Sequence, residues 1–319
     1  MTAAKRTVLV TGTTGFIGKH VVRALAKAGW QVRAASRDPT TTRAMAGVEP
    51  VAMPDLRSPA DWSPLIKGVS HIVHLAGIAH APGALPDELY RRINTDAVGE
   101  LARAARGTIE RLVLISSVRA QAGLAADHLI TEKDAPQPTD PYGRSKLEAE
   151  RLLQASGVGF TVLRPAVIYG KGVKGNIASL ATLAQTPMPL PFGALENRRS
   201  LLALENLASA IDLVLVSPDA AGETYLAADT EPISVAELVT AMREGLGRAP
   251  HLVDVPAGAV KRLMATFGKE ADWERLSGSF VIDAAKLRGI GWAPRIKTRE
   301  GIAKMMRATN GAAGDVGGL

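Results

Sequence analysis

Three glycines that follow a short apolar run constrain the fold of this chain more than any other feature. Gly12, Gly15 and Gly18 occur at G-x-x-G-x-x-G spacing directly after residues 8–10, and a helical pattern begins at Ile17. In a strand–turn–helix unit, such glycines permit the tight turn, let the backbone approach a pyrophosphate and let the helix pack against the strand. The free N–H groups at the helix N-terminus attract the anion. The turn therefore predicts a dinucleotide-binding site.

Apolar runs of strand length alternate with helical patterns through the first half of the chain. The first helix ends near Gly29, and a later one is expected over residues 144–155. This alternation predicts an α/β fold in which helices cover both faces of a parallel sheet, within roughly residues 5–168. We therefore expect a Rossmann doubly wound parallel sheet with a smaller C-terminal substrate-binding domain. The remaining strands are expected at residues 32–35, 71–75, 112–115 and 158–163.

The pattern changes after Pro165. Three prolines within residues 186–192 predict an ordered loop or edge segment, whereas residues 204–216 and 233–247 have helical patterns. The expected domains are an NAD(P)-binding Rossmann domain of residues 1–168 plus about 200–225, a substrate-binding domain of residues 169–199 and 226–308, and a flexible tail of residues 309–319.

Composition excludes several classes of protein. The 319 residues are 46% hydrophobic and 22% charged, as in a globular protein and unlike a disordered chain. No apolar run approaches the ~20 residues that cross a bilayer, and the first run is too short for a secretory signal. Without cysteine there is no disulfide or thiolate zinc site. The net charge of +7 comes from scattered basic residues with only 4% aromatics, unlike a nucleic-acid-binding stripe. We expect a cytoplasmic protein with no metal site, no nucleic-acid partner and no membrane insertion.

The end of the second expected strand bears on the choice of cofactor. An NAD site usually has an acidic residue there, which holds the ribose hydroxyls of the adenosine. This chain has Ser36 followed by Arg37, and a small hydroxyl beside a guanidinium suits a ribose 2′-phosphate. We expect NADP as the cofactor, with NAD as the alternative because Asp38 follows closely.

A tyrosine and a lysine are spaced to share one helix face. Tyr142 and Lys146 are four residues apart at the opening of a helix. An ammonium beside a phenol favours the phenolate, so we expect the pKa of Tyr142 to fall toward neutrality, as an acid–base group in alcohol–ketone interconversion requires. Ser116 and Ser117 follow the strand over residues 112–115, at the carboxyl edge of the sheet where ligands bind. A serine hydroxyl at this edge can form a hydrogen bond with the reacting oxygen of the substrate.

These features together resemble a known family. The sequence is similar to the extended short-chain dehydrogenase/reductases, in the branch of NAD(P)-dependent nucleotide-sugar epimerases and reductases that are UDP-glucose 4-epimerase-like. The likeness covers most of the chain. The matching pieces, in the family's order, are residues 11–18, Asp55 with Leu56, residues 74–77, Asn94, Ser116 with Ser117, residues 142–146, and Arg164 with Pro165.

The resemblance implies a role for each catalytic residue. Tyr142 would be the acid–base, and Lys146 would hold the nicotinamide ribose. Ser117 would orient the sugar hydroxyl. We choose Ser117 over Ser116 because it lies twenty-five residues before Tyr142, which is the spacing expected for epimerases of this type.

The resemblance also implies the cofactor contacts. Asp55 would contact the adenine and Leu56 would line its pocket, while Pro165 and Ala166 would flank the nicotinamide. Asn94 would lie on the helix behind the cofactor. With the glycine turn and the end of the second strand, the full expected set is Gly12, Gly15, Phe16, Ile17, Gly18, Ser36, Arg37, Asp55, Leu56, Leu75, Ala76, Gly77, Asn94, Ser116, Tyr142, Lys146, Pro165 and Ala166.

The second half of the chain carries the other expected substrate contacts. Residues 175–176, 191–193 and 197–200 resemble the segments that hold a nucleoside diphosphate in sugar epimerases. Arg199 offers a charge-assisted fork to a phosphate. Asn176 can donate to the same group, and Phe192 gives a flat surface for a uracil. Arg275 is a further expected diphosphate ligand.

Three reactions share this scaffold. Dehydratases of the family usually carry an Asp-Glu pair after the catalytic hydroxyl, whereas Val118 and Arg119 follow Ser117 here, so dehydration is disfavoured. Arg119 can instead reach a substrate phosphate or acetamido oxygen, or face solvent. We expect a C4 epimerase of a UDP-hexose or UDP-N-acetylhexosamine, with an NADPH-dependent 4-keto-sugar reductase as the main alternative.

Two other functions stay open. One is a reductase of another carbonyl compound, and the other is a non-catalytic dinucleotide sensor, which typically would have lost the tyrosine or the lysine that this chain retains. The expected partner is a nucleotide-sugar substrate. Relatives often form homodimers through two helices, for which residues 92–105 and 143–155 are the candidates.

Overall fold

A seven-stranded parallel sheet forms the larger lobe of the molecule. The structure is a computed structural model and describes residues 6–42, 44–79, 85–266, 268, 273 and 276–314. The strand order is β10-β6-β5-β4-β1-β2-β3, with every neighbouring pair parallel. Because the order reverses between β1 and β4, this is a doubly wound Rossmann sheet, and the expected fold class is confirmed. The strands are β1 Thr7–Thr11, β2 Gln31–Ser36, β3 Val48–Ala52, β4 His71–His74, β5 Arg111–Ile115, β6 Phe160–Pro165 and β10 Glu223–Ala227.

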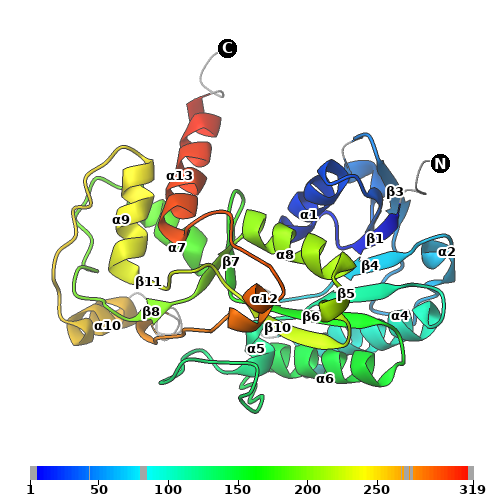
Figure 1. The fold of residues 1–319 in the computed structure, drawn as a ribbon. Coiled ribbons are helices and arrows are strands. Elements are labelled where there is room, and N and C mark those ends of the chain that lie inside the picture. Colours follow the sequence, from blue (N-terminus) through cyan, green and yellow to red (C-terminus); the bar gives the residue numbers. More distant parts are fainter. Residues whose placement is uncertain are drawn as a thin grey trace.

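Helices cover both faces of this sheet (Figure 1). On one face α1 (Phe16–Lys27) packs against α8 (Leu204–Val216), and on the other α4 (Ala97–Ala105) packs against α6 (Pro141–Ala155). Each helix turns an apolar stripe toward the strands, and removing these stripes from water stabilises the lobe. The buried side chains include Val21, Leu25, Leu207 and Ile211 on the first face, and Leu101, Ala105, Ala149 and Leu153 on the second.

The connection between β4 and β5 contains a π-helical turn. The short helix α3 (Asp87–Tyr90) continues through this turn, η2 (Arg91–Asp96), into α4. A π-helical turn widens the helix locally and is frequent at functional sites. The remaining short elements of this lobe are η1 Pro39–Thr41, α2 Ser63–Ile66, α5 Val118–Gln121 and η3 Pro218–Ala220.

The smaller lobe comes from the C-terminal half of the chain, with α9, α10 and α13 at the opposite end of the molecule from β3 (Figure 1). A third apolar core, formed by residues between Tyr169 and Met306, holds it together. It includes two two-stranded sheets, parallel β7–β9 and antiparallel β8–β11. The expected domain division by residue number stays a prediction. The other elements of the second half are β7 Val167–Tyr169, α7 Asn176–Ala184, β8 Arg198–Arg199, β9 Leu201–Ala203, β11 Ile233–Ser234, α9 Val235–Gly245, α10 Ala257–Thr266, α12 Ala285–Gly289 and α13 Thr298–Gly314.

The sheet differs from the sequence expectation at both edges. At one edge β10 adds a strand from the second half, so the sheet is not confined to residues 5–168. At the other edge lies β3, which the sequence pattern does not predict because Pro50 interrupts it. A proline cannot donate to a strand ladder, and it is tolerated here because β3 is an edge strand.

Two helix ends also differ from expectation. α6 begins at Pro141, three residues before the expected start at 144, because the Asp140 carboxylate accepts a hydrogen bond from the Gly143 N–H at 2.6 Å and caps the helix. α13 continues to Gly314 and so includes residues 309–314 of the expected tail, whose flexibility stays a prediction. Residues 315–319 lie outside the described residues. The proline-rich segment over residues 186–192 is not helical, as expected.

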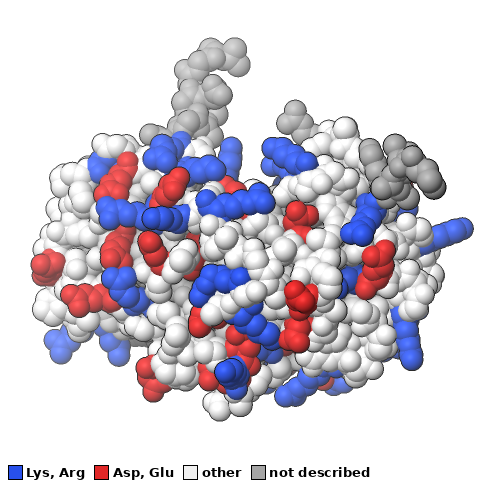
Figure 2. Space-filling view, viewed as in Figure 1, with Lys and Arg blue, Asp and Glu red and all other residues white. Residues whose placement is uncertain are grey.

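Basic and acidic side chains are interspersed on the face of the molecule that Figure 2 shows. Mixed charge of this kind gives no single large field that would attract a polyanion. Within the part of the chain that the structure describes, no helix combines the length and apolar character needed to span a bilayer. The same residues contain no cluster of three or more His, Cys, Asp or Glu side chains that could hold a metal ion.

Candidate active site

The glycine turn has the geometry that a pyrophosphate requires. Gly12 has φ +70°, and a Cβ on it would lie 2.8 Å from the backbone nitrogen of Ala76. A Cβ on Gly18 would lie 2.3 Å from the Gly12 carbonyl oxygen. Gly15 caps α1 without any side-chain hydrogen bond and is exposed, so the first-turn N–H groups face an open approach. These residues fit a bound dinucleotide, as the sequence predicts.

A buried histidine joins the first and fourth strands beneath that turn. The Thr11 hydroxyl lies 3.0 Å from His74 Nδ1 and accepts hydrogen bonds from the Leu75 and Ala76 N–H groups at 3.2 and 3.1 Å. Burial, and then the charge of Lys146, lower the pKa of His74 to about 3, so the ring is neutral. The contacts fix the segment after β4 against β1, at the point where the strand order reverses.

The π-helical turn positions Asn94 between two parts of the site. Its amide accepts from the Ile78 N–H and donates to the Ile78 carbonyl, both at 2.9 Å, and also donates to Ser145 Oγ at 3.0 Å. A Cβ on Gly77 would lie 2.8 Å from Asn94 Oδ1. Asn94 therefore ties the segment after β4 to α6, and its place behind the cofactor stays a prediction.

The two adjacent serines after β5 point to different partners. Ser116 is buried and donates to Glu150, which also forms an ion pair with Arg164 at 2.5 Å. Ser117 instead hydrogen-bonds the Tyr142 side chain, and its Oγ accepts from the Arg119 N–H at 3.1 Å. The structure thus brings Ser117, and not Ser116, to the tyrosine.

The start of α6 sets the separation of the two side chains that the sequence predicts to be catalytic. Tyr142 and Lys146 are one turn apart on this helix, which begins against α5. A Cβ on Gly143 would lie 2.3 Å from the Arg119 carbonyl oxygen, so only glycine allows this approach. The Tyr90 ring meets that of Tyr142 edge-on at 6.4 Å.

The pKa values of Tyr142 and Lys146 correct one expectation. Burial raises the pKa of Tyr142 to about 12, against the lowering by its hydrogen bond with Ser117 and by the Arg119 charge. The expected fall toward neutrality is therefore wrong for the protein without its ligands. Burial also lowers the pKa of Lys146 to about 8, although the nearby Glu150 raises it. The lysine can thus titrate close to neutral pH.

At the adenosine end, the expected residues make mostly local contacts. Ser36 is buried and donates to the Asp38 carbonyl at 2.9 Å, whereas Arg37 is exposed. Asp55 is held by Arg57, with Nη2 to Oδ2 at 2.7 Å, which lowers the pKa of the Asp55 carboxyl to about 2. The charge of Arg37 contributes the smallest of the effects that lower that pKa, which places it near Asp55. Of the Ser36–Arg37 pair, only the arginine is available to a ligand.

The substrate end is assembled around Arg199. Its guanidinium donates to the carbonyls of Gly278 and Leu124 at 2.7 and 2.8 Å and lies over the Phe280 ring at 5.9 Å. Burial, and then the charge of Arg119, lower its pKa to about 10. The sequence reasoning missed these three contacts, because they join segments more than seventy residues apart.

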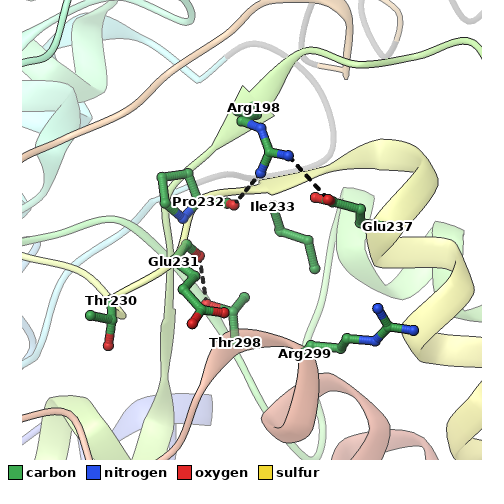
Figure 3. A pocket seen from close by; sticks show the side chains of 8 residues that line it. All are labelled: Arg198, Thr230, Glu231, Pro232, Ile233, Glu237, Thr298 and Arg299. Carbon is green, nitrogen blue, oxygen red and sulfur yellow. Dashed lines mark hydrogen bonds and ion pairs between the residues drawn. The ribbon is translucent and has the colours of Figure 1, made fainter.

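Arg198, which precedes Arg199 on β8, contacts a different part of the molecule. Arg198 donates to the Pro232 carbonyl at 2.9 Å and to Glu237 at 3.1 Å, and it lines a pocket of ≈ 360 Å³ with Thr298 and Arg299 (Figure 3). Arg199 is not among the residues lining this pocket. Successive side chains alternate along a strand, so the two arginines serve different surfaces.

Two of the other residues expected to contact the substrate, Phe192 and Asn176, lie in different surroundings. Phe192 is buried in the third core, and its role as a flat surface for a uracil stays a prediction. Asn176 is half-buried at the start of α7, after Gly175 with φ +68°. Arg275 lies outside the described residues.

Arg119 is mostly buried beside the catalytic serine. It forms an ion pair with Asp140 at 2.5 Å. Its Nε and Nη1 are buried, and no hydrogen-bond partner for them is present in the described ranges. Buried donors usually have partners. The positive charge of Arg119 lowers the pKa of Arg199, so Arg119 is a second cation close to Arg199.

Comparisons with known proteins agree with this geometry. The model of the NAD dependent epimerase/dehydratase family matches residues 8–228. The chain belongs to this family. It is 32% identical over 315 residues to the UDP-glucose 4-epimerase of Vibrio cholerae, with 95% of both chains covered. It is 28% identical over 269 residues to the ceramide reductase of Caulobacter vibrioides, covering 80% of this chain and 75% of that protein.

Solved structures of the family have the same fold. MoeE5 in complex with UDP-glucose and NAD superposes with a TM-score of 0.74 at 26% identity, covering 96% of this chain and 99% of that one. The chain is therefore an enzyme of the extended short-chain dehydrogenase/reductase fold, similar to nucleotide-sugar epimerases and to reductases.

Proposed function

We propose that the protein is an NAD(P)-dependent C4 epimerase of a nucleotide sugar, a UDP-hexose or UDP-N-acetylhexosamine. The observation that carries this proposal is the hydrogen bond of Ser117 with Tyr142, with Lys146 one helical turn away. This constellation suits the interconversion of an alcohol and a ketone. Support for the substrate comes from the relative named UDP-glucose 4-epimerase and from the UDP-glucose bound to MoeE5.

In this reaction the chain moves a proton, and the bound nicotinamide supplies the acceptor and donor of hydride at C4. Tyr142 Oη takes the proton of the C4 hydroxyl as the alcohol is oxidised, and returns it as the ketone is reduced on its other face. Ser117 hydrogen-bonds the reacting oxygen. Because burial holds the Tyr142 pKa at about 12, the positive charge of Lys146 is needed to favour the phenolate.

The residues of the glycine turn would hold the cofactor pyrophosphate, and Lys146 its nicotinamide ribose. We propose that NADP(H) is preferred. The exposed Arg37 at the end of β2, where no acidic residue stands, supports a 2′-phosphate. NAD is the alternative, supported by the family description and by the NAD bound in MoeE5.

Arg199 is proposed to bind the substrate diphosphate, with Asn176 and Arg119 nearby as further donors. The two guanidiniums influence each other electrostatically, and only Arg119 has a carboxylate partner among the described residues. A diphosphate would supply the missing negative charge.

The second candidate function is an NADPH-dependent 4-keto-sugar reductase. Arg37 favours it, because net reduction needs an exchangeable reductant, commonly NADPH, whereas an epimerase keeps its nicotinamide resident. A reductase of another carbonyl compound is the third candidate, supported by the similarity to a ceramide reductase. A dinucleotide sensor is disfavoured, because Tyr142 and Lys146 are both present.

Mass spectrometry of the purified protein, followed by a panel of UDP-sugars with and without NADPH, tests the proposal. An epimerase would carry bound nicotinamide and interconvert UDP-glucose with UDP-galactose, or the N-acetylated pair, without added reductant. Turnover only with NADPH and a 4-keto sugar would establish the reductase. No turnover or binding of any UDP-sugar would overturn both.

We further propose a homodimer that works in the cytoplasm. The candidate contact comprises residues 92–105 and 143–155, where Leu152 is 38% exposed on α6. Light scattering of the purified protein tests the dimer, and Leu152→Glu should shift it toward the monomer.

A further inference from the structure

A second pocket lies beside the glycine turn and is not used by the catalytic residues. It has a volume of ≈ 390 Å³. Thr13 and Thr14 of the turn line one side, Lys19 and Arg23 of α1 line another, and the segment after η1 closes it. Thr41, the last residue of η1, and Thr42, which follows it, are part of this lining.

The position of this pocket follows from how the turn is tied to β2. The Thr13 hydroxyl donates to the Ala35 carbonyl at 3.2 Å, so the turn sits against the carboxyl end of β2. In a dinucleotide-binding fold, the adenosine ribose lies at that end, with its 2′ oxygen near the residues that follow the strand. The pocket is bounded by the turn and by residues that follow β2, namely Thr41, Thr42, Ala44 and Met45, whereas Ser36 and Arg37 do not line it.

The charge of the pocket is positive and uncompensated. Neither Lys19 nor Arg23 forms an ion pair or hydrogen bond with any residue in the described ranges, and no acidic residue lines the pocket. Both cations are exposed, at i and i+4 on one face of α1. Two cations with several hydroxyls are the donors that a phosphate monoester uses.

We propose that this pocket binds the 2′-phosphate of NADP(H), and that Lys19 and Arg23 are the residues that set the preference for NADP(H) over NAD(H). The inference rests on the proposed function, because it gives a physical basis to the proposed cofactor preference. It adds two helix residues that the strand-end pattern of Ser36 and Arg37 does not contain. NAD(H) lacks the phosphate and would leave the pocket unfilled.

Cofactor binding by the full-length protein tests the inference without any sugar substrate. Titration with NADPH and NADH, followed by nicotinamide fluorescence, should give tighter binding of NADPH to the wild type. Lys19→Ala and Arg23→Ala should each weaken NADPH binding by about tenfold to a hundredfold, the range expected for loss of one charge-assisted hydrogen bond. NADH binding should change by less than about threefold. Displacement of NADPH by 2′,5′-ADP and by 5′-AMP isolates the phosphate, because the two probes differ only there.

Lys27→Ala is the matched control, since Lys27 is an exposed cation in the last turn of the same helix and does not line the pocket. It should leave both affinities unchanged. Equal affinity of the wild type for NADPH and NADH would overturn the inference. So would an equal loss of both affinities in the pocket variants, because the cations would then act on the shared pyrophosphate. If the binding preference holds while no UDP-sugar is turned over, the proposed function fails and the pocket assignment stands.

Discussion

The catalytic end and the substrate end of this molecule are built from different kinds of structure. Ser117, Tyr142 and Lys146 lie at the end of β5 and on α6, next to the buried network of Ser116, Glu150 and Arg164. Arg199 lies on a two-residue strand, and among the described residues its guanidinium is held by two backbone carbonyls and an aromatic ring.

This difference separates the positions of the reacting groups, which the sheet fixes, from the loops around Arg199, which can vary. The carboxyl edge of a parallel sheet gives the reacting groups fixed positions whatever the substrate. The loops that hold Arg199 can change without disturbing that edge. The sheet edge is shared by several reactions, so the reaction that we propose rests on the side chains placed there, and the proposed substrate contacts rest on the smaller lobe.

Removing the phenol hydroxyl should have the largest effect. Tyr142→Phe should lower kcat by about 10²–10⁴-fold, because the group that moves the proton is lost. Cofactor affinity should persist, since the glycine turn is untouched. Tyr90→Phe is the matched control: its ring meets that of Tyr142 edge-on, and its loss of a hydroxyl should change kcat little. Steady-state kinetics checks both, and a fully active Tyr142→Phe would mean that another group does the chemistry.

Ion pairs in the two lobes should differ in their effect on stability. Glu150 is 1% exposed in its pair with Arg164, and breaking such a buried pair costs about 3–5 kcal/mol. The pair of Arg198 with Glu237 is exposed, so breaking it should cost about 0–1 kcal/mol. Urea unfolding of Glu150→Gln and Glu237→Gln measures both, and Gln at 237 can still serve the capping box. Equal losses would mean that the buried network is not what fixes the catalytic end.

The sequence predicts the catalytic end far better than the substrate end. The spacing to Tyr142 favours Ser117 over Ser116, and Ser117 is the serine that contacts Tyr142 in the structure, because strand, turn and helix are all local patterns. The glycine turn is predicted for the same reason. Burial depends on packing between segments that are distant in sequence, which a local pattern does not show. The predicted direction of the Tyr142 pKa shift is therefore wrong.

Long-range packing explains the other differences. Phe192 belongs to the third core, which is assembled from segments distant in sequence, and the motif around it does not predict this burial. The partners of Arg199, at Leu124 and Gly278, carry no pattern that spacing could detect. β10 joins the sheet from beyond residue 200 for the same reason.

Adjacent arginines on β8 test whether the substrate end acts separately from catalysis. Arg199→Gln should raise KM for the UDP-sugar by about tenfold to a hundredfold with a smaller change in kcat, because a charged hydrogen bond to the diphosphate is lost. Arg198→Gln, one residue away and directed into the other pocket, should change KM by less than about threefold. Equal effects of the two variants would mean that β8 as a whole, and not the Arg199 side chain, supports binding.

The smallest expected effect is a difference in pH dependence between the two ends. Because burial lowers the pKa of Lys146 to about 8, its ammonium is present below that pH and is lost as the pH rises through it. kcat/KM should therefore be about halved near pH 8 and fall up to about tenfold per unit above it. Arg199, with a pKa lowered only to about 10, keeps its charge over this range, so the affinity for UDP itself should stay constant to about pH 9. Tyr142, at about 12, does not account for the fall. Kinetics and UDP calorimetry from pH 6 to 9.5 separate the two, and UDP affinity that declines in parallel with kcat/KM would show that one titrating group serves both ends.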